Sequence, residues 1–127
     1  MDDATHHPLI LIVDDELLIR ESLADALGDH GFETLTAAGG EEALQLYDTR
    51  DVDAIVTDMY MGGSDGFVLI HALRMRADTV PIIVMSGGRP ELARTLGADA
   101  TLTKPFRPRQ LTQMLDVLLD RVAAPVA

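Results

Sequence analysis

The chain has 127 residues, a length that suits one domain with a hydrophobic core of its own. Hydrophobic residues make up 47% and charged residues 24%, the proportions of a globular protein rather than a disordered one. The absence of cysteine excludes disulfides and thiolate chemistry. The formal net charge of −11, with no run of Lys or Arg, argues against direct nucleic-acid binding, and aromatic residues at 4% offer no surface for stacking bases.

The N-terminal sequence carries no targeting or membrane signal. Residues 1–8 are polar and acidic, and the apolar run Leu9–Val13 is too short for a signal-peptide core or a membrane span. We therefore expect a cytoplasmic protein without membrane contact. Residues 1–8 are predicted to be a disordered lead, residues 9–122 one domain, and residues 123–127 a frayed tail.

Short apolar segments alternate along the chain with segments in which apolar residues recur every three or four positions. The first kind predicts strands and the second predicts helices. In chain order, the predicted elements are strand Leu9–Val13, helix Glu16–Leu27, strand Glu33–Thr36, a helix that begins after Gly40, strand Ala54–Thr57, a helix over about Asp65–Arg76, strand Pro81–Met85, a helix over about Arg89–Leu96, strand Ala100–Thr103, and a helix from Pro108 to Val122.

The strands predict how the sheet is covered. Leu9–Val13 and Pro81–Met85 are apolar throughout instead of alternating with polar residues, as in strands that are covered on both faces. Five strand–helix repeats favour a parallel sheet with helices on both sides. The fold class predicted from the pattern is therefore α/β, doubly wound, with five parallel strands.

Chemically active residues follow four of these strands. Asp14 and Asp15 come after the first strand, Asp58 after the third, Ser86 after the fourth and Lys104 after the fifth. Ligands of an open parallel sheet bind beyond the carboxyl ends of its strands, which lie along one edge. We therefore expect these five side chains to converge on one site.

Three carboxylates at one edge need a cation. A lone Asp after a strand is most often a helix cap, but like charges about 4 Å apart repel by roughly 1–4 kcal/mol at effective dielectric constants of about 80 to 20. Mg²⁺ prefers such carboxylates together with backbone carbonyls, water and a phosphate oxygen. Lys104 carries its charge on a long stem that can reach an anion. The set predicts a Mg²⁺-dependent phosphoryl site.

The order of these residues resembles the receiver domain of two-component response regulators. The matching stretches, in register over roughly residues 9–122, are Leu9–Asp15, Val56–Met61 with Asp65-Gly66, Ile82–Ser86 and Leu102–Phe106. The resemblance implies a flavodoxin-like (βα)5 fold of strand order 2-1-3-4-5. It also implies a switch that changes a protein-interaction surface and catalyses only its own phosphorylation and dephosphorylation.

The resemblance also implies a role for each site residue. Asp58 would accept the phosphoryl group, Ser86 would be the switch hydroxyl, and Lys104 would pair with the phosphoryl group, with a cis bond to Pro105. The implied Mg²⁺ ligands are Asp14, Asp15, Asp58 and the backbone carbonyl of Tyr60. The implied partners are a sensor histidine kinase or histidine phosphotransfer protein as donor, and a downstream protein target or effector domain.

Three features depart from the family pattern. Gly62 stands where the family usually has Pro, which predicts a looser loop before Asp65. Thr101 replaces the usual aromatic residue three positions before the Lys, so no ring can swing there to report the switch. The stretch from Ser86 to Lys104 is several residues short, which falls on the fourth helix. Output through that region is therefore expected to be atypical.

Two other functions stay open on sequence grounds. One is a pseudo-receiver that binds partners without phosphorylation, which Thr101 leaves room for and the complete acidic set argues against. The other is a Mg²⁺-dependent phosphatase or phosphotransferase for small substrates, against which stand the short chain and the lack of an Asp-x-Asp pair directly after any predicted strand. Residues His6, His7 and His71 are read as ordinary surface or lead residues.

Overall fold

The computed structural model describes residues 7–59, 65–88 and 90–120. Within them, five parallel strands form one sheet in the order β2-β1-β3-β4-β5, as predicted. The strands are β1 (Leu9–Val13), β2 (Glu33–Ala37), β3 (Ala54–Asp58), β4 (Ile82–Ser86) and β5 (Ala100–Thr103).

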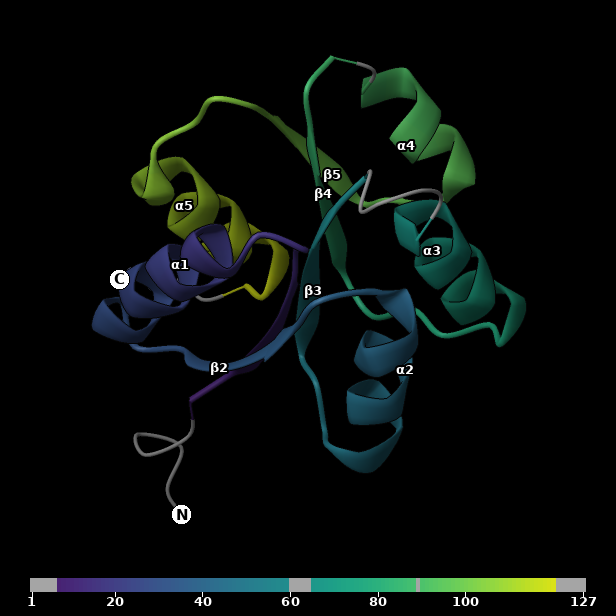
Figure 1. The fold of residues 1–127 in the computed structure, drawn as a ribbon, viewed down its shortest axis with the longest axis horizontal. Coiled ribbons are helices and arrows are strands. Elements are labelled where there is room, and N and C mark those ends of the chain that lie inside the picture. The colour runs from purple at the N-terminus through teal and green to yellow at the C-terminus, as the bar shows by residue number, and fades with distance from the viewer. Residues whose placement is uncertain (1–6, 60–64, 89, 121–127) are drawn as a thin grey trace.

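The helices connect successive strands and cover both faces of the sheet (Figure 1). Helices α1 and α5 lie side by side on one face, and α2, α3 and α4 lie on the other. The helices are α1 (Leu17–Asp29), α2 (Gly40–Thr49), α3 (Asp65–Met75), α4 (Pro90–Leu96) and α5 (Pro108–Leu118).

Each face of the sheet has its own hydrophobic core, and successive strand residues alternate between the two. Leu11 and Val13 of β1 pack toward α2, α3 and α4, whereas Ile10 and Ile12 pack toward α1 and α5. Every residue of β1, β3 and β4 is buried. The continuous apolar runs are explained by this two-sided burial, because a strand with one wet face would alternate.

The predicted elements agree with the observed ones except at their ends. Strands β3 and β4 each extend one residue further than predicted and end on Asp58 and Ser86, so these site residues belong to the strands. Helix α4 has only seven residues, in line with the short fourth helix expected. The fifth helix was predicted through Val122, but α5 ends at Leu118, and Asp120 has a positive φ of 60° that a helix cannot continue through.

At the end of the sheet opposite the site, two aspartates each make a pair of hydrogen bonds to the first residue of a neighbouring strand. Asp53 donates its backbone N–H to Leu9 O (2.8 Å) and accepts the Leu9 N–H on its carboxylate (2.7 Å). Asp99 makes the same pair of bonds with Ile82 (2.9 and 2.8 Å). These bonds satisfy backbone groups at the starts of β1 and β4 and hold the end of the sheet that lies away from the site.

The N-terminal lead meets the sheet before Leu9. The Pro8 carbonyl accepts the Glu33 N–H at 2.9 Å, and His7 Nδ1 lies 3.1 Å from the Gly31 carbonyl. Residues 1–6 and 121–127 lie outside the described ranges, so the division at residues 9 and 122 stays a prediction. No helix among the described residues combines the length and apolar character needed to cross a membrane.

Candidate functional site

Asp58 lies at the centre of the carboxyl edge of the sheet, on the last residue of β3. It is 8% exposed, and its Oδ2 accepts a hydrogen bond from the Lys104 ammonium at 3.1 Å. Residues 46 positions apart in the chain therefore meet because β3 and the end of β5 reach the same edge. One oxygen of the Asp58 carboxylate is therefore paired with an ammonium group, a donor that can also bind an anion.

Lys104 is held in place by β4, the strand that lies between β3 and β5 in the sheet. Its backbone N–H donates to the Ser86 carbonyl at 2.8 Å, which extends the β4–β5 pairing by one residue. The bond between Lys104 and Pro105 is cis, as predicted. The backbone N–H of Lys104 thus ties it to β4, and the side chain extends from there to Asp58.

Asp14 and Asp15 complete an acidic cluster with Asp58. One carboxylate oxygen from each of the three residues lies within 4.8 Å of the other two. Asp14 is fully buried, Asp58 is nearly so, and Asp15 is exposed. The convergence predicted for Asp14, Asp15, Asp58 and Lys104 is therefore observed.

One oxygen of the buried Asp14 carboxylate has no hydrogen-bond partner among the described residues. Oδ1 accepts the Glu16 N–H at 2.9 Å, but Oδ2 is buried and has no hydrogen-bond partner among the described residues. Burial raises the pKa of Asp14 above its ordinary 3.8, the Glu16 N–H and Lys104 lower it, and the charges of Asp58 and Asp15 raise it further. An unpaired buried oxygen beside two more carboxylates is a donor set that fits Mg²⁺.

Ser86 ends β4 beside this cluster. Its side chain is buried, and its Oγ accepts the Gly88 N–H at 3.1 Å. Gly87 and Gly88 both have open space where a Cβ would lie. Ser86 directly follows Met85, which pairs with Asp58 in the sheet. The hydroxyl therefore stands on the strand next to Asp58, at the start of a loop with little side-chain packing.

Thr101 lies two strands away from Asp58. It is half-buried on β5 and pairs with Val84, on the face opposite Leu102. The position where the family usually has an aromatic ring is therefore occupied here by a short, half-buried side chain on β5. Two other predictions, the Tyr60 carbonyl as a ligand and the looser loop at Gly62, fall outside the described residues.

One residue at the site had no role assigned from sequence, Gly66. A Cβ on Gly66 would meet the backbone of Met59, including its carbonyl oxygen, and would stand 2.5 Å from the Asp58 carbonyl oxygen. Glycine is therefore required where the first turn of α3 crosses the end of β3. The Asp65-Gly66 pair was the available signal, but spacing alone could not show that it touches Asp58.

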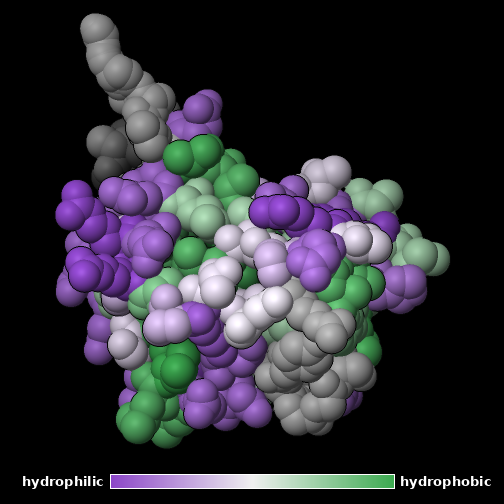
Figure 2. Space-filling view, turned by 90° about the horizontal axis from the view of Figure 1, so that it is seen from above, coloured by the Kyte–Doolittle hydropathy of each residue, from purple (hydrophilic) through white to green (hydrophobic). Residues whose placement is uncertain are grey.

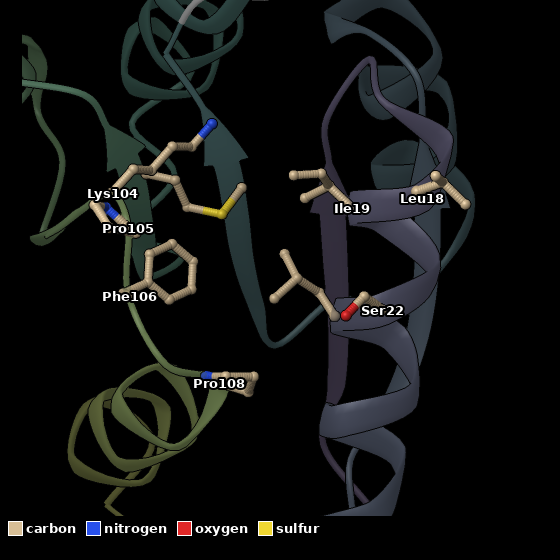
Figure 3. A pocket seen from close by; sticks show the side chains of 9 residues that line it. Leu18, Ile19, Ser22, Lys104, Pro105, Phe106 and Pro108 are labelled. Carbon is tan, nitrogen blue, oxygen red and sulfur yellow. The ribbon is translucent and has the colours of Figure 1, made fainter.

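An apolar cleft of about 720 Å³ opens beside the site, between α1 and the segment that joins β5 to α5. Figure 3 shows Phe106 and Pro105 facing Ile19 across the cleft, with the Lys104 ammonium turned away from Phe106. Leu18 lies on its rim and is 78% exposed. The wider surface seen from above in Figure 2 is mixed, with hydrophobic patches separated by hydrophilic residues.

Comparison with known proteins places the chain in a family. The family model described as the response regulator receiver domain matches residues 10–116. The chain is 37% identical over 121 residues to the probable transcriptional regulator ycf27 of Cyanidium caldarium, covering 92% of the chain and 47% of that protein. It is 35% identical over 118 residues to the aerobic respiration control protein ArcA of Escherichia coli K12, covering 90% and 49%. The chain thus spans about half the length of the curated relatives it matches.

Solved structures agree with the sequence comparison. The chemotaxis response regulator CheY4 of Vibrio cholerae superposes with a TM-score of 0.81 at 33% identity, covering 89% of this chain and 99% of that one. The receiver domain of the Francisella response regulator 1452 gives a TM-score of 0.85 at 31% identity, covering 91% and 98%. With the family model matching most of its length, the chain belongs to the response regulator receiver domain family.

Proposed function

We propose that Asp58 is the residue of this receiver that accepts a phosphoryl group, and that the acidic cluster around it holds Mg²⁺. The observation that carries the proposal is the meeting of three carboxylates and the Lys104 ammonium at the carboxyl edge of the sheet. The family's known dependence on Mg²⁺ and phosphorylation fits this donor set. Asp14, Asp15 and Asp58 would hold the ion together with the Tyr60 carbonyl.

The chemistry proposed for Asp58 is a direct displacement at phosphorus. One carboxylate oxygen of Asp58 forms the new P–O bond while the bond from phosphorus to the donor's nitrogen breaks, and the product is an acyl phosphate. Mg²⁺, when bound, neutralises charge on the phosphoryl oxygens. Lys104 already donates to Asp58 Oδ2 and would move that donation to a phosphoryl oxygen.

The proposed output of phosphorylation starts at Ser86. The phosphoryl group adds about 1.5–2 negative charges near neutral pH. Such a charge would attract the Ser86 hydroxyl, which now accepts the Gly88 N–H, and would break that contact with the following loop. Because Thr101 supplies no ring, we place the resulting change in the loop and in α4.

The proposed phosphoryl donor is a sensor histidine kinase or a histidine phosphotransfer protein. The proposed target of the phosphorylated domain is a downstream protein or an effector domain. The relative ycf27 of Cyanidium caldarium is named as a probable transcriptional regulator and is about twice as long as this chain. The prediction that nucleic acid is not bound directly concerns these 127 residues alone. A cytoplasmic location and the lack of any activity beyond the chain's own phosphorylation belong to the same proposal.

The two alternatives are not favoured by the site. A pseudo-receiver has no need for an unpaired buried carboxylate oxygen, which is costly without a cation. A phosphatase for small substrates needs a polar pocket over the acids, whereas the cleft between α1 and the segment from β5 to α5 is lined mainly by apolar residues and lies to one side of them.

The proposal is tested with a small phosphodonor. Wild-type protein incubated with phosphoramidate and Mg²⁺ should gain the mass of one phosphoryl group, and a chelator should prevent the gain. Asp58→Asn should gain none, whereas Asp53→Asn, which alters an aspartate that clasps Leu9 at the opposite edge, should still be modified. Labelling of Asp58→Asn at the wild-type rate would place the acceptor elsewhere.

A further inference from the structure

Asp14 has only one polar atom left for a ligand, because its other polar atoms are bonded within the protein. Its N–H donates to the Ala37 carbonyl at 3.1 Å, and its Oδ1 accepts the Glu16 N–H at 2.9 Å. Its backbone carbonyl accepts a hydrogen bond from Arg20 Nη1 at 2.9 Å. Only Oδ2 has no partner among the described residues.

We propose that Arg20 is a positioning residue for the metal site, which holds the peptide joining Asp14 to Asp15 so that both carboxylates face Asp58. This inference rests on the proposed function. The peptide it holds is the single link between a buried and an exposed carboxylate of the cluster. A rotation of that peptide would move the Asp15 side chain and tilt Asp14 away from its two backbone contacts.

The location of Arg20 in α1 supports this role. Arg20 lies near the start of α1, and its backbone N–H bonds to the Glu16 carbonyl in the first turn. A cation near the N-terminus of a helix is disfavoured by the helix dipole, so a compensating interaction is expected there. The half-buried side chain finds it by folding back to the Asp14 carbonyl. The guanidinium is a hydrogen-bond donor that makes this bond whether or not the acids are ionised.

A simpler role for Arg20 would be to offset the negative charge of the cluster. The two roles predict opposite changes in Mg²⁺ affinity when Arg20 is removed. If Arg20 were only a nearby positive charge, its removal would tighten Mg²⁺ binding, because the cation would meet less repulsion. If Arg20 positions the Asp14–Asp15 peptide, its removal weakens Mg²⁺ binding, as loss of a group that orients metal ligands generally does, by about 10–100-fold.

The test compares Mg²⁺ dissociation constants of the wild type, Arg20→Gln, Arg20→Lys and Arg50→Gln by NMR titration. Arg50 is an exposed residue at the end of α2, and its variant controls for loss of one positive charge. We expect binding roughly tenfold weaker in Arg20→Gln, intermediate in Arg20→Lys, and near wild type in Arg50→Gln. In the metal-free protein, the Asp15 amide ¹⁵N shift should move in Arg20→Gln, because it senses the bond to the preceding carbonyl.

Unchanged or tighter Mg²⁺ binding by Arg20→Gln, or an Asp15 amide shift that stays at its wild-type value, would overturn the inference. If Arg20→Gln does not fold, Arg20→Lys decides by the same two readouts, since it keeps the charge and loses the planar donor group. Asp14→Asn separates the two levels of the argument. If the wild type binds Mg²⁺ no better than Asp14→Asn does, the proposed function fails, and the role of Arg20 fails with it.

Discussion

At the scale of single residues, Asp14 provides a ligand for a cation and lowers the stability of the metal-free protein. Its carboxylate is fully buried, lies near Asp15 and Asp58, and leaves Oδ2 without a partner. Burial and the neighbouring acids together raise its pKa. A carboxyl group in such surroundings is one that the folded chain prefers to have protonated or bound to a metal.

Asp14→Asn should therefore make the metal-free protein more stable. A carboxyl whose pKa is higher in the folded than in the unfolded chain binds more protons when folded, so stability falls as pH rises from 3.8 through the raised pKa. At neutral pH the wild type therefore carries a loss of stability that the variant, which has no carboxyl group at this position, does not. Thermal unfolding should show a gain of a few degrees at pH 7 that shrinks toward pH 3.8.

Mg²⁺ should reverse this ranking. Saturating Mg²⁺ should raise the melting temperature of the wild type and leave that of Asp14→Asn nearly unchanged, because ligand binding stabilises only a chain that binds it. A metal-free Asp14→Asn variant that melts below the wild type at pH 7 would contradict the electrostatic account of this residue.

At the scale of elements, the crossing of α3 over the end of β3 connects the fold to the site. Gly66 lies in the first turn of α3, against the backbone of Asp58 and Met59. Any side chain there must push the helix away from the strand that carries Asp58. The close contact therefore fixes the position of Asp58 as well as the packing of α3.

Gly66→Ala should destabilise the fold by about 1–3 kcal/mol, the usual cost of forcing extra atoms into a packed site. Gly28→Ala is the matched control. Gly28 lies inside α1 with open space around its Cβ position, so alanine should stabilise that helix by roughly 0.5–1 kcal/mol. Urea unfolding measures both. Equal effects of the two substitutions would show that the Gly66 contact does not constrain the chain.

The C-terminal end of α4 is fixed to α3 by one arginine, Arg74. Its guanidinium donates to three backbone carbonyls and one carboxylate, at distances of 2.8–3.0 Å: Gly97 O, Asp78 O, Val80 O and Asp99 Oδ2. These bonds tie the end of α3 to the turn between α4 and β5. Movement of α4 on phosphorylation should therefore pivot at its fixed C-terminal end and be largest at its N-terminal end, which follows Gly87 and Gly88 in the chain.

Arg74→Ala should lower stability by about 2–3 kcal/mol, because several partly buried acceptors lose a charged donor at once. Arg76→Ala is the control, since Arg76 pairs only with the exposed Asp48 in the contacts described and exposed ion pairs contribute little. Chemical denaturation of both variants checks the difference. A loss for Arg76→Ala as large as that for Arg74→Ala would contradict the special role of Arg74.

At the scale of the whole molecule, the proposed function leads us to predict that a phosphodonor protein approaching Asp58 covers the apolar cleft beside Lys104. Leu18 on its α1 side is 78% exposed, and the preceding residue in α1, Leu17, is 54% exposed. Leu18→Glu should slow transfer from a histidine phosphodonor protein by about tenfold or more and leave phosphorylation by phosphoramidate unchanged.

Val117→Glu is the control for that substitution. Val117 is 69% exposed on α5 and does not line the cleft, so a charge there should leave both reactions near the wild-type rate. An equal slowing of the small-donor reaction by Leu18→Glu would place the defect at the site itself and not in docking.

Much of the fold could be predicted from the sequence. Burial on both faces gives β1 and β4 an unbroken apolar run, and apolar residues recur every three or four positions in the helices. The convergence of Asp14, Asp15, Asp58 and Lys104 followed from their places at strand ends. The contacts of Gly66 and Arg20 could not be predicted, since they depend on distances between elements that no local pattern encodes. The end of α5 was missed because its apolar spacing continues to Val122 beyond the last helical turn.

The most direct test of the account is to locate the phosphoryl group chemically. Protein phosphorylated with Mg²⁺ and a small donor is reduced with borohydride, which converts an aspartyl phosphate to homoserine, and the peptides are mapped by mass spectrometry. The account predicts homoserine at position 58 and unchanged aspartate at positions 14 and 15. Homoserine at either of those positions, or at none of the three in protein that carries the added mass, would contradict it.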